Sequence, residues 1–93
     1  MKESEVKSLY QKWCDDNNGQ KPNRAVIKMA WEDGDNTENG WQEDIIALEE
    51  LDELDDDNIL FYAFGLEGLL ELMRPNNGND FIVVEVEKFY YQW

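Results

Sequence analysis

The sequence DFIVVEVEKFYYQW, residues 80–93, carries the strongest strand pattern in the chain. β-Branched and aromatic residues dominate it, and neither glycine nor proline interrupts it. Because side chains alternate along a strand, Phe81 and Val83 are expected on one face, and the even-numbered residues from Ile82 to Lys88 on the other. The pattern predicts a long final β-strand.

A short strand and a helix are expected immediately before this final strand. Residues 58–64 contain the aromatic-rich run ILFYAF, which predicts a short buried strand that ends at Gly65. Residues 66–74 repeat leucine or methionine at helical spacing, which predicts a helix, and Pro75 prevents its continuation. The apolar face of this helix comprises Leu66, Leu69, Leu70 and Met73.

The N-terminal part of the chain begins with a helix over residues 4–16. Ser4 suits the N-cap position, and the triplet Asn17-Asn18-Gly19 provides a C-terminal stop. One apolar stripe runs along this helix, formed by Val6, Leu9, Tyr10, Trp13 and Cys14. Because the lone cysteine, Cys14, lies on that stripe, we interpret it as a buried structural thiol and not as a nucleophile.

Two further strands are expected on either side of a glycine-containing loop. Residues 24–32 are rich in β-branched residues, and the Asp-Gly and Asn-Gly dipeptides that follow are typical of turns. Residues 41–48 are interpreted as a strand that pairs with 24–32. Three leucines also fit helical spacing, so residues 41–54 remain open between strand and helix.

The expected order of elements is α-β-β-β-α-β, in a single acidic α+β domain that covers residues 1–93. The simplest packing is a mixed or antiparallel sheet of about four strands with two covering helices. Hydrophobic residues make up 42% of the chain, including four Trp, four Tyr and four Phe, which is adequate for a small core. A disordered acidic segment would lack these aromatic residues.

Charge is distributed unevenly along the chain. The formal net charge is −14, and residues 29–73 contain 15 carboxylates but no lysine or arginine. We call residues 29–73 the acidic stretch. The remaining residues hold eight basic groups and seven carboxylates, so they are almost neutral. This distribution argues against direct binding to nucleic acid or to an anionic membrane surface, since both depend on lysine and arginine.

The chain lacks the residues that several classes of function require. The chain has no histidine, which excludes Ser-His and Cys-His catalytic arrangements, and residues 65–68 match no phosphate-binding loop. We therefore expect that the protein is not an enzyme and holds no cofactor. The N-terminus lacks the apolar segment of a signal peptide, and no apolar run approaches the roughly 20 residues of a membrane span. The expectation is a soluble, cytoplasmic protein.

The loop between the two expected middle strands is rich in oxygen ligands, which Ca²⁺ requires. An EF-hand pattern starts acceptably at Asp35 but has Ile46 where the last ligand, a bidentate glutamate, is required. A polar hairpin loop is therefore the better interpretation. We expect no metal site.

The acidic stretch leaves two functional hypotheses of different classes. The first is a protein-binding module that docks its carboxylates onto a basic surface, and its sharpest form is a DNA mimic that inhibits a nucleic-acid-binding protein. The second is an accessory or structural subunit that associates, with a partner or with itself, through its aromatic C-terminal strand. In that case acidity serves only solubility.

Each hypothesis has its own candidate residues. The candidate acidic face consists of the carboxylates between residues 43 and 57: Glu43, Asp44, Glu49, Glu50, Asp52, Glu53, Asp55, Asp56 and Asp57. The candidate aromatic anchors, whose residue types are common in interfaces, are Trp41, Tyr90, Tyr91 and Trp93. The C-terminal anchors are favoured, because chain ends tend to be exposed.

Overall fold

The computed structural model describes residues 1–31, 42–49 and 59–92. The elements in these ranges are α1 (Glu3–Asp16), β1 (Arg24–Trp31), β2 (Gln42–Ala47), β3 (Ile59–Tyr62), α2 (Gly65–Leu72) and β4 (Phe81–Tyr90). The predicted α+β class and the order α-β-β-β-α-β are confirmed. Of the segment left open, residues 42–47 form a strand, and residues 50–54 lie outside the described ranges.

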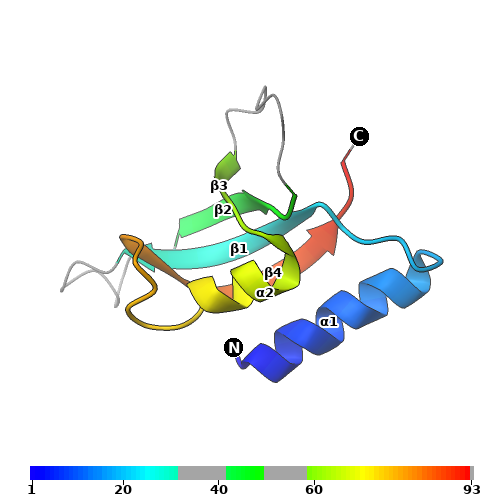
Figure 1. The fold of residues 1–93 in the computed structure, drawn as a ribbon, viewed down its shortest axis with the longest axis horizontal. Helices are drawn as coiled ribbons and strands as arrows, with labels where there is room; N and C mark the ends of the chain where they lie inside the picture. Colours follow the sequence, from blue (N-terminus) through cyan, green and yellow to red (C-terminus); the bar gives the residue numbers. More distant parts are fainter. Residues whose placement is uncertain (32–41, 50–58, 93) are drawn as a thin grey trace.

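The strands form one mixed sheet in the order β3-β2-β1-β4 (Figure 1). β1 pairs antiparallel with both β2 and β4, which confirms the expected pairing of residues 24–32 with 41–48. β2 pairs parallel with β3, so β3 and β4 form the two edges of the sheet. Met1 covers part of the β4 edge, where its amino group donates to the Val84 carbonyl at 3.2 Å.

The start of α1 differs from the prediction. Its N-cap is Lys2 and not Ser4, which lies inside the first helical turn. The backbone N–H of Lys2 donates to the Glu5 carboxylate at 3.2 Å. Because Glu5 satisfies a backbone donor that has no partner within the helix, the helix begins upstream of Ser4.

The end of α1 follows the prediction. Asn18 and Gly19 adopt left-handed conformations, with φ of 59° and 84°. The Gly19 N–H donates to the Cys14 carbonyl at 2.8 Å, which satisfies a carbonyl at the helix C-terminus. Cys14 is itself buried, as its place on the apolar stripe predicted.

β4 confirms the expected long strand, but its faces do not follow strict alternation. Val83, Val86 and Phe89 all belong to the core cluster. The pairing with β1 skips Val84 and Glu87, so each forms a bulge that shifts the alternation by one position. The predicted placement of Val86 on the face opposite Val83 is therefore wrong. Alternation holds only between bulges, and the two bulges together keep Val83, Val86 and Phe89 on the core side of a ten-residue strand.

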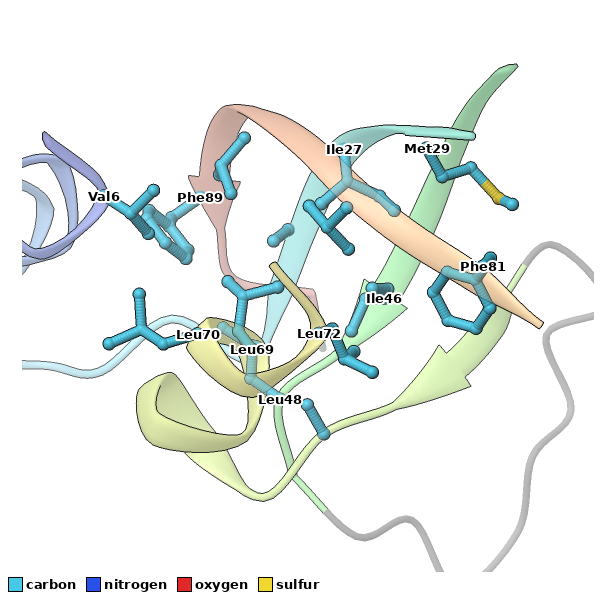
Figure 2. Close-up of a cluster of buried hydrophobic side chains, with 14 residues drawn as sticks. Val6, Ile27, Met29, Ile46, Leu48, Leu69, Leu70, Leu72, Phe81 and Phe89 are labelled. Carbon is cyan, nitrogen blue, oxygen red and sulfur yellow. The ribbon is translucent and has the colours of Figure 1, made fainter. Parts of the chain in front are cut away.

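The core lies between the two helices and one face of the sheet (Figures 1 and 2). Val6 of α1 and Leu69 and Leu70 of α2 are fully buried there, together with Ile27 and Ile46 of the sheet. Each side chain of this kind contributes about 1.5–3 kcal/mol when fully buried. This packing places α2 against α1 and β4, on the side of the sheet that carries the core.

Candidate functional site

The described part of the chain contains three residues of the candidate acidic face. Glu43 and Asp44 belong to β2, and Glu49 follows it. Because neighbouring residues of a strand point to opposite faces, β2 does not bring Glu43 and Asp44 to one surface, and Glu49 lies beyond the other end of the strand. The remaining members lie outside the described residues: Glu50, Asp52, Glu53, Asp55, Asp56 and Asp57.

Glu49 is held in place by the buried side chain of Asn23. The Nδ2 atom of Asn23 donates to Glu49 Oε1 at 3.1 Å and to the Gln92 carbonyl at 2.8 Å. The Oδ1 atom of Asn23 accepts from the Gln92 backbone N–H at 2.8 Å. In addition, the Leu48 N–H donates to the Asn23 carbonyl at 2.9 Å. One carboxylate of the acidic stretch thus has a defined position beside the end of β4.

Lys28 lies on the sheet face opposite the helices, among carboxylates of both neighbouring strands. Its Nζ atom is 3.4 Å from Glu85 Oε2 and 3.4 Å from Glu87 Oε1. The hydrogen bond to Glu87 and the charge of Glu85 raise the pKa of Lys28. Glu43 lies directly opposite Lys28 in the register between β1 and β2. This cation, the last before the acidic stretch, therefore stays charged and engaged with β4.

Arg74, the first cation after the acidic stretch, binds to the start of α1. Its Nη2 atom donates to Glu3 Oε1 at 2.8 Å, and its Nε atom donates to Glu3 Oε2 at 3.3 Å. This hydrogen bonding lowers the pKa of Glu3 from its ordinary value of 4.5. The two cations that border the acidic stretch are thus paired with carboxylates that lie outside it.

Two of the candidate aromatic anchors are described, and both are half-buried. Tyr90 ends β4 opposite Arg24, and the Nζ atom of Lys88 lies 5.6 Å from the centre of its ring. Tyr91 follows, and the next residue, Gln92, is bound to Asn23. Trp41 and Trp93 lie outside the described residues. Association through the C-terminal strand stays a prediction.

Among the described residues, the most exposed aromatic side chains lie elsewhere, at a pocket beside the β3 edge. The pocket has a volume of about 380 Å³ and lies between β3, α2 and the loop before β4. Its lining residues are Phe61, Tyr62, Ala63, Phe64, Gly68, Glu71, Leu72, Asn77 and Asn79. Phe64 is 75% exposed and Phe61 40% exposed. The prediction of a buried strand over 58–64 is therefore wrong for these two phenylalanines, because β3 is an edge strand of four residues.

Sequence reasoning missed this pocket, although the sequence contains a signal for it. Phe61 and Tyr62 are consecutive, so in a strand they cannot both face the same core. Phe64 directly precedes Gly65, which takes a left-handed conformation with φ of 69° at the start of α2. A side chain at such a turn between a strand and a helix is seldom enclosed. Phe61, Tyr62 and Phe64 are three large aromatic side chains within four positions, and the β3 edge of the sheet does not bury all of them.

The described part of the chain contains neither a candidate metal site nor a helix that could span a membrane. Within residues 1–31, 42–49 and 59–92, no three His, Cys, Asp or Glu side chains are grouped so that they could hold a metal ion. In the same ranges, no helix has the length and apolar character to cross a membrane.

Neither a scan of protein-family models nor searches of curated proteins and solved structures gave a match.

Proposed function

We propose that this protein is a binding module that docks a carboxylate-rich surface onto a basic surface of a partner protein. The observation that carries the proposal is the separation of charge along the chain. The acidic stretch holds 15 carboxylates and no cation, whereas the rest of the chain is almost neutral. A surface that serves solubility alone would be served equally well by interspersed lysines.

The arrangement of the bordering cations supports this proposal. Lys28 pairs with Glu85 and Glu87, and Arg74 pairs with Glu3. Both bordering cations are thus engaged with carboxylates that lie outside the acidic stretch. A basic partner would supply the missing countercharge.

The energetics of like charges point in the same direction. Carboxylates that repel one another destabilise the compact state, so a one-signed surface lowers the stability of the isolated protein. Contact with a basic surface relieves this repulsion. Complementary potentials also steer the encounter and raise the association rate above the about 10⁵–10⁶ M⁻¹s⁻¹ of neutral surfaces.

In the most specific form of the proposal, the partner is itself a nucleic-acid-binding protein. Such a protein presents lysine and arginine at the spacing of phosphates, and a carboxylate-rich surface competes for the same cations. The protein then acts as a DNA mimic that blocks its partner. Under this form, duplex DNA and the protein exclude each other from the partner.

The experiment is a pull-down from cell lysate, with the full chain as bait, at low and at high salt. Two variants matched in charge are compared with wild type. In the first, Asp55→Lys and Asp56→Lys alter the candidate acidic face. In the second, Asp15→Lys and Asp16→Lys alter the exposed end of α1, where cations favour the helix dipole. Each replacement adds two charges, so both variants change the net charge from −14 to −10.

Loss of the captured partner in the first variant, with retention in the second and elution by salt, is the expected result. Addition of duplex DNA should also release a nucleic-acid-binding partner. Capture that resists high salt, or that both variants weaken equally, would contradict docking through the candidate acidic face. Capture that duplex DNA leaves intact would contradict the DNA-mimic form alone.

A further inference from the structure

We propose that the pocket at the β3 edge receives an arginine side chain of a basic protein partner. This inference rests on the proposed function and extends it. An acidic surface alone attracts any cationic protein, whereas a pocket for one side chain sets the position and orientation of the partner. The pocket also belongs to the acidic stretch for most of its lining, from Phe61 to Leu72.

The aromatic rings of the pocket provide a platform for a flat cation. The rings of Phe61 and Tyr62 are stacked, with centroids 6.1 Å apart and an interplanar angle of 19°. The ring of Phe64 meets Tyr62 edge to face, with centroids 5.4 Å apart at 75°. With 75% of Phe64 exposed, its ring is available to a ligand. Exposed aromatic faces attract cations, and arginine stacks on them through its planar guanidinium.

Glu71 gives the pocket a negative charge. It is exposed on α2, and it lines the pocket together with Gly68 from the previous turn. Within the described part of the chain, the lining contains no lysine or arginine. Arg74 is near enough for the charge of Glu71 to raise its pKa, but its guanidinium hydrogen-bonds to Glu3 on α1. A ligand cation therefore does not compete with an internal salt bridge of Glu71.

Asn77 shapes the remaining wall and is engaged within the protein. Its Nδ2 atom donates to the carbonyls of Leu72 and Phe81, both at 3.1 Å. Its Oδ1 atom accepts from the Asn79 N–H at 2.9 Å. These bonds join the end of α2 to the start of β4, so the wall opposite the rings is preformed. A preformed pocket loses less entropy when a side chain enters.

The chemistry of the pocket selects its occupant. An apolar side chain would remove water from the Glu71 carboxylate without offering it a partner, which is unfavourable. An anion would be repelled by the same carboxylate and by the acidic stretch. A long cationic side chain places its methylene stem on the rings and its charged end beside Glu71. Arginine fits better than lysine, because only guanidinium combines ring stacking with a bidentate contact to a carboxylate.

Phe64 connects this pocket to the candidate acidic face. It also borders a second hollow of about 500 Å³, whose lining includes Leu48, Glu49 and Glu67. Glu49 is the carboxylate that Asn23 holds at the end of β2. The residues next to an arginine bound in the pocket are therefore within reach of Glu49 when the segment runs over Phe64.

The test is an NMR titration of the full-length ¹⁵N-labelled protein with three blocked tripeptides of sequence Gly-X-Gly, where X is arginine, lysine or citrulline. Citrulline matches arginine in shape and lacks its charge. The arginine peptide is expected to shift the amide signals of residues 61–64 and 71 and to bind about 3- to 10-fold more tightly than the citrulline peptide. The spectrum also reports whether each variant is folded.

Two substitutions and a matched control complete the test. Glu71→Gln should remove most of the preference for arginine over citrulline, and Phe64→Ala should weaken arginine binding about threefold. Glu67→Gln is the control, because Glu67 lies one turn earlier on α2, carries the same charge near Arg74 and does not line this pocket. It should leave arginine binding unchanged.

Several outcomes would overturn the inference. These are the absence of binding, shifts confined to other residues, equal affinity for citrulline, and equal losses in the Glu67 and Glu71 variants. Equal affinity for lysine would overturn the assignment to arginine. Failure of the proposed function is separate: there the arginine peptide binds in this pocket, yet Asp55→Lys with Asp56→Lys leaves partner capture intact.

Discussion

Asn23 shows how a single side chain holds together parts of this fold that are distant in sequence. It is only 4% exposed, and its amide bonds to Glu49, 26 positions away, and to Gln92, 69 positions away. Both hydrogen bonds with Gln92 are 2.8 Å long and form a closed ring with the backbone. Asn23 therefore fastens the chain beyond β4 to the start of β1.

Replacement of this residue tests its contribution to stability. Asn23→Ala leaves the N–H and carbonyl of Gln92 without their partner and should lower the free energy of unfolding by about 1–3 kcal/mol. Urea unfolding followed by tryptophan fluorescence measures the change. Gln20→Ala, at an exposed position three residues earlier, is the control and should stay within about 0.5 kcal/mol of wild type. Equal stability of the two variants would mean that the hydrogen bonds of the Asn23 side chain do not stabilise the fold.

At this scale the sequence predicted residue classes but not partners. Cys14 was expected to be buried because it shares a stripe with Val6, and both are buried. Asn23 gave no signal, since its partners are identified only after the sheet has formed. Phe61 was misassigned for a related reason: a local pattern does not tell whether a strand lies at the edge or in the centre of a sheet.

At the scale of elements, helices and strands were predictable because each has its own periodicity, and so was the pairing of β1 with β2, but the rest of their arrangement was not. The order β3-β2-β1-β4 and the parallel pairing of β2 with β3 follow from contacts between distant segments. The bulges of β4 show the same limit within one element. Alternation fails at Val84 and Glu87 because the register is set by β1 and not by β4 alone.

The contact between α1 and α2 gives a pH-dependent prediction. Glu3 near the start of α1 pairs with Arg74 beyond the end of α2, and this pairing lowers the pKa of Glu3. A carboxyl group with a lowered pKa stabilises the folded state above its ordinary value of 4.5, and this stabilisation disappears as the pH falls through the lowered pKa. Because both side chains are exposed, the effect is small.

The comparison is between wild type and Glu3→Gln in urea at several pH values. At neutral pH the variant should have a lower unfolding midpoint, and the difference should shrink as the pH falls through the lowered pKa of Glu3 and this carboxyl group becomes protonated. Arg74→Gln should reproduce the loss, and the double variant should be no less stable than either single one. A difference that persists unchanged in acid would show that the pair contributes by packing and not by charge.

At the scale of the whole molecule, the distribution of charge determines how the fold responds to its surroundings. The candidate acidic face was predicted from composition, but only Glu43, Asp44 and Glu49 lie in the described part, and β2 spreads them over different surfaces. Composition predicts the sign of a surface and not its shape. The aromatic pocket supplies a shape, which composition could not predict, since it depends on where β3 and α2 meet.

The net charge of −14 makes a final prediction about stability in salt. Raising the ionic strength from about 0.01 M to about 1 M shortens the screening length from about 30 Å to about 3 Å. Salt weakens the exposed ion pairs of Lys28 and Arg74, but it also weakens repulsion among 22 carboxylates opposed by only eight cations, and the repulsion dominates. Sodium chloride should therefore raise the free energy of unfolding, by the order of 1 kcal/mol.

Urea unfolding at several salt concentrations measures this gain, and the charge variants control for effects of salt that are unrelated to charge. The variants Asp55→Lys with Asp56→Lys and Asp15→Lys with Asp16→Lys both carry −10, so both should gain less from salt than wild type. If repulsion is concentrated in the acidic stretch, the first variant should lose more of the gain than the second. A fall in stability with salt would show that the ion pairs outweigh the repulsion, and the isolated protein would then have no electrostatic strain for a basic partner to relieve.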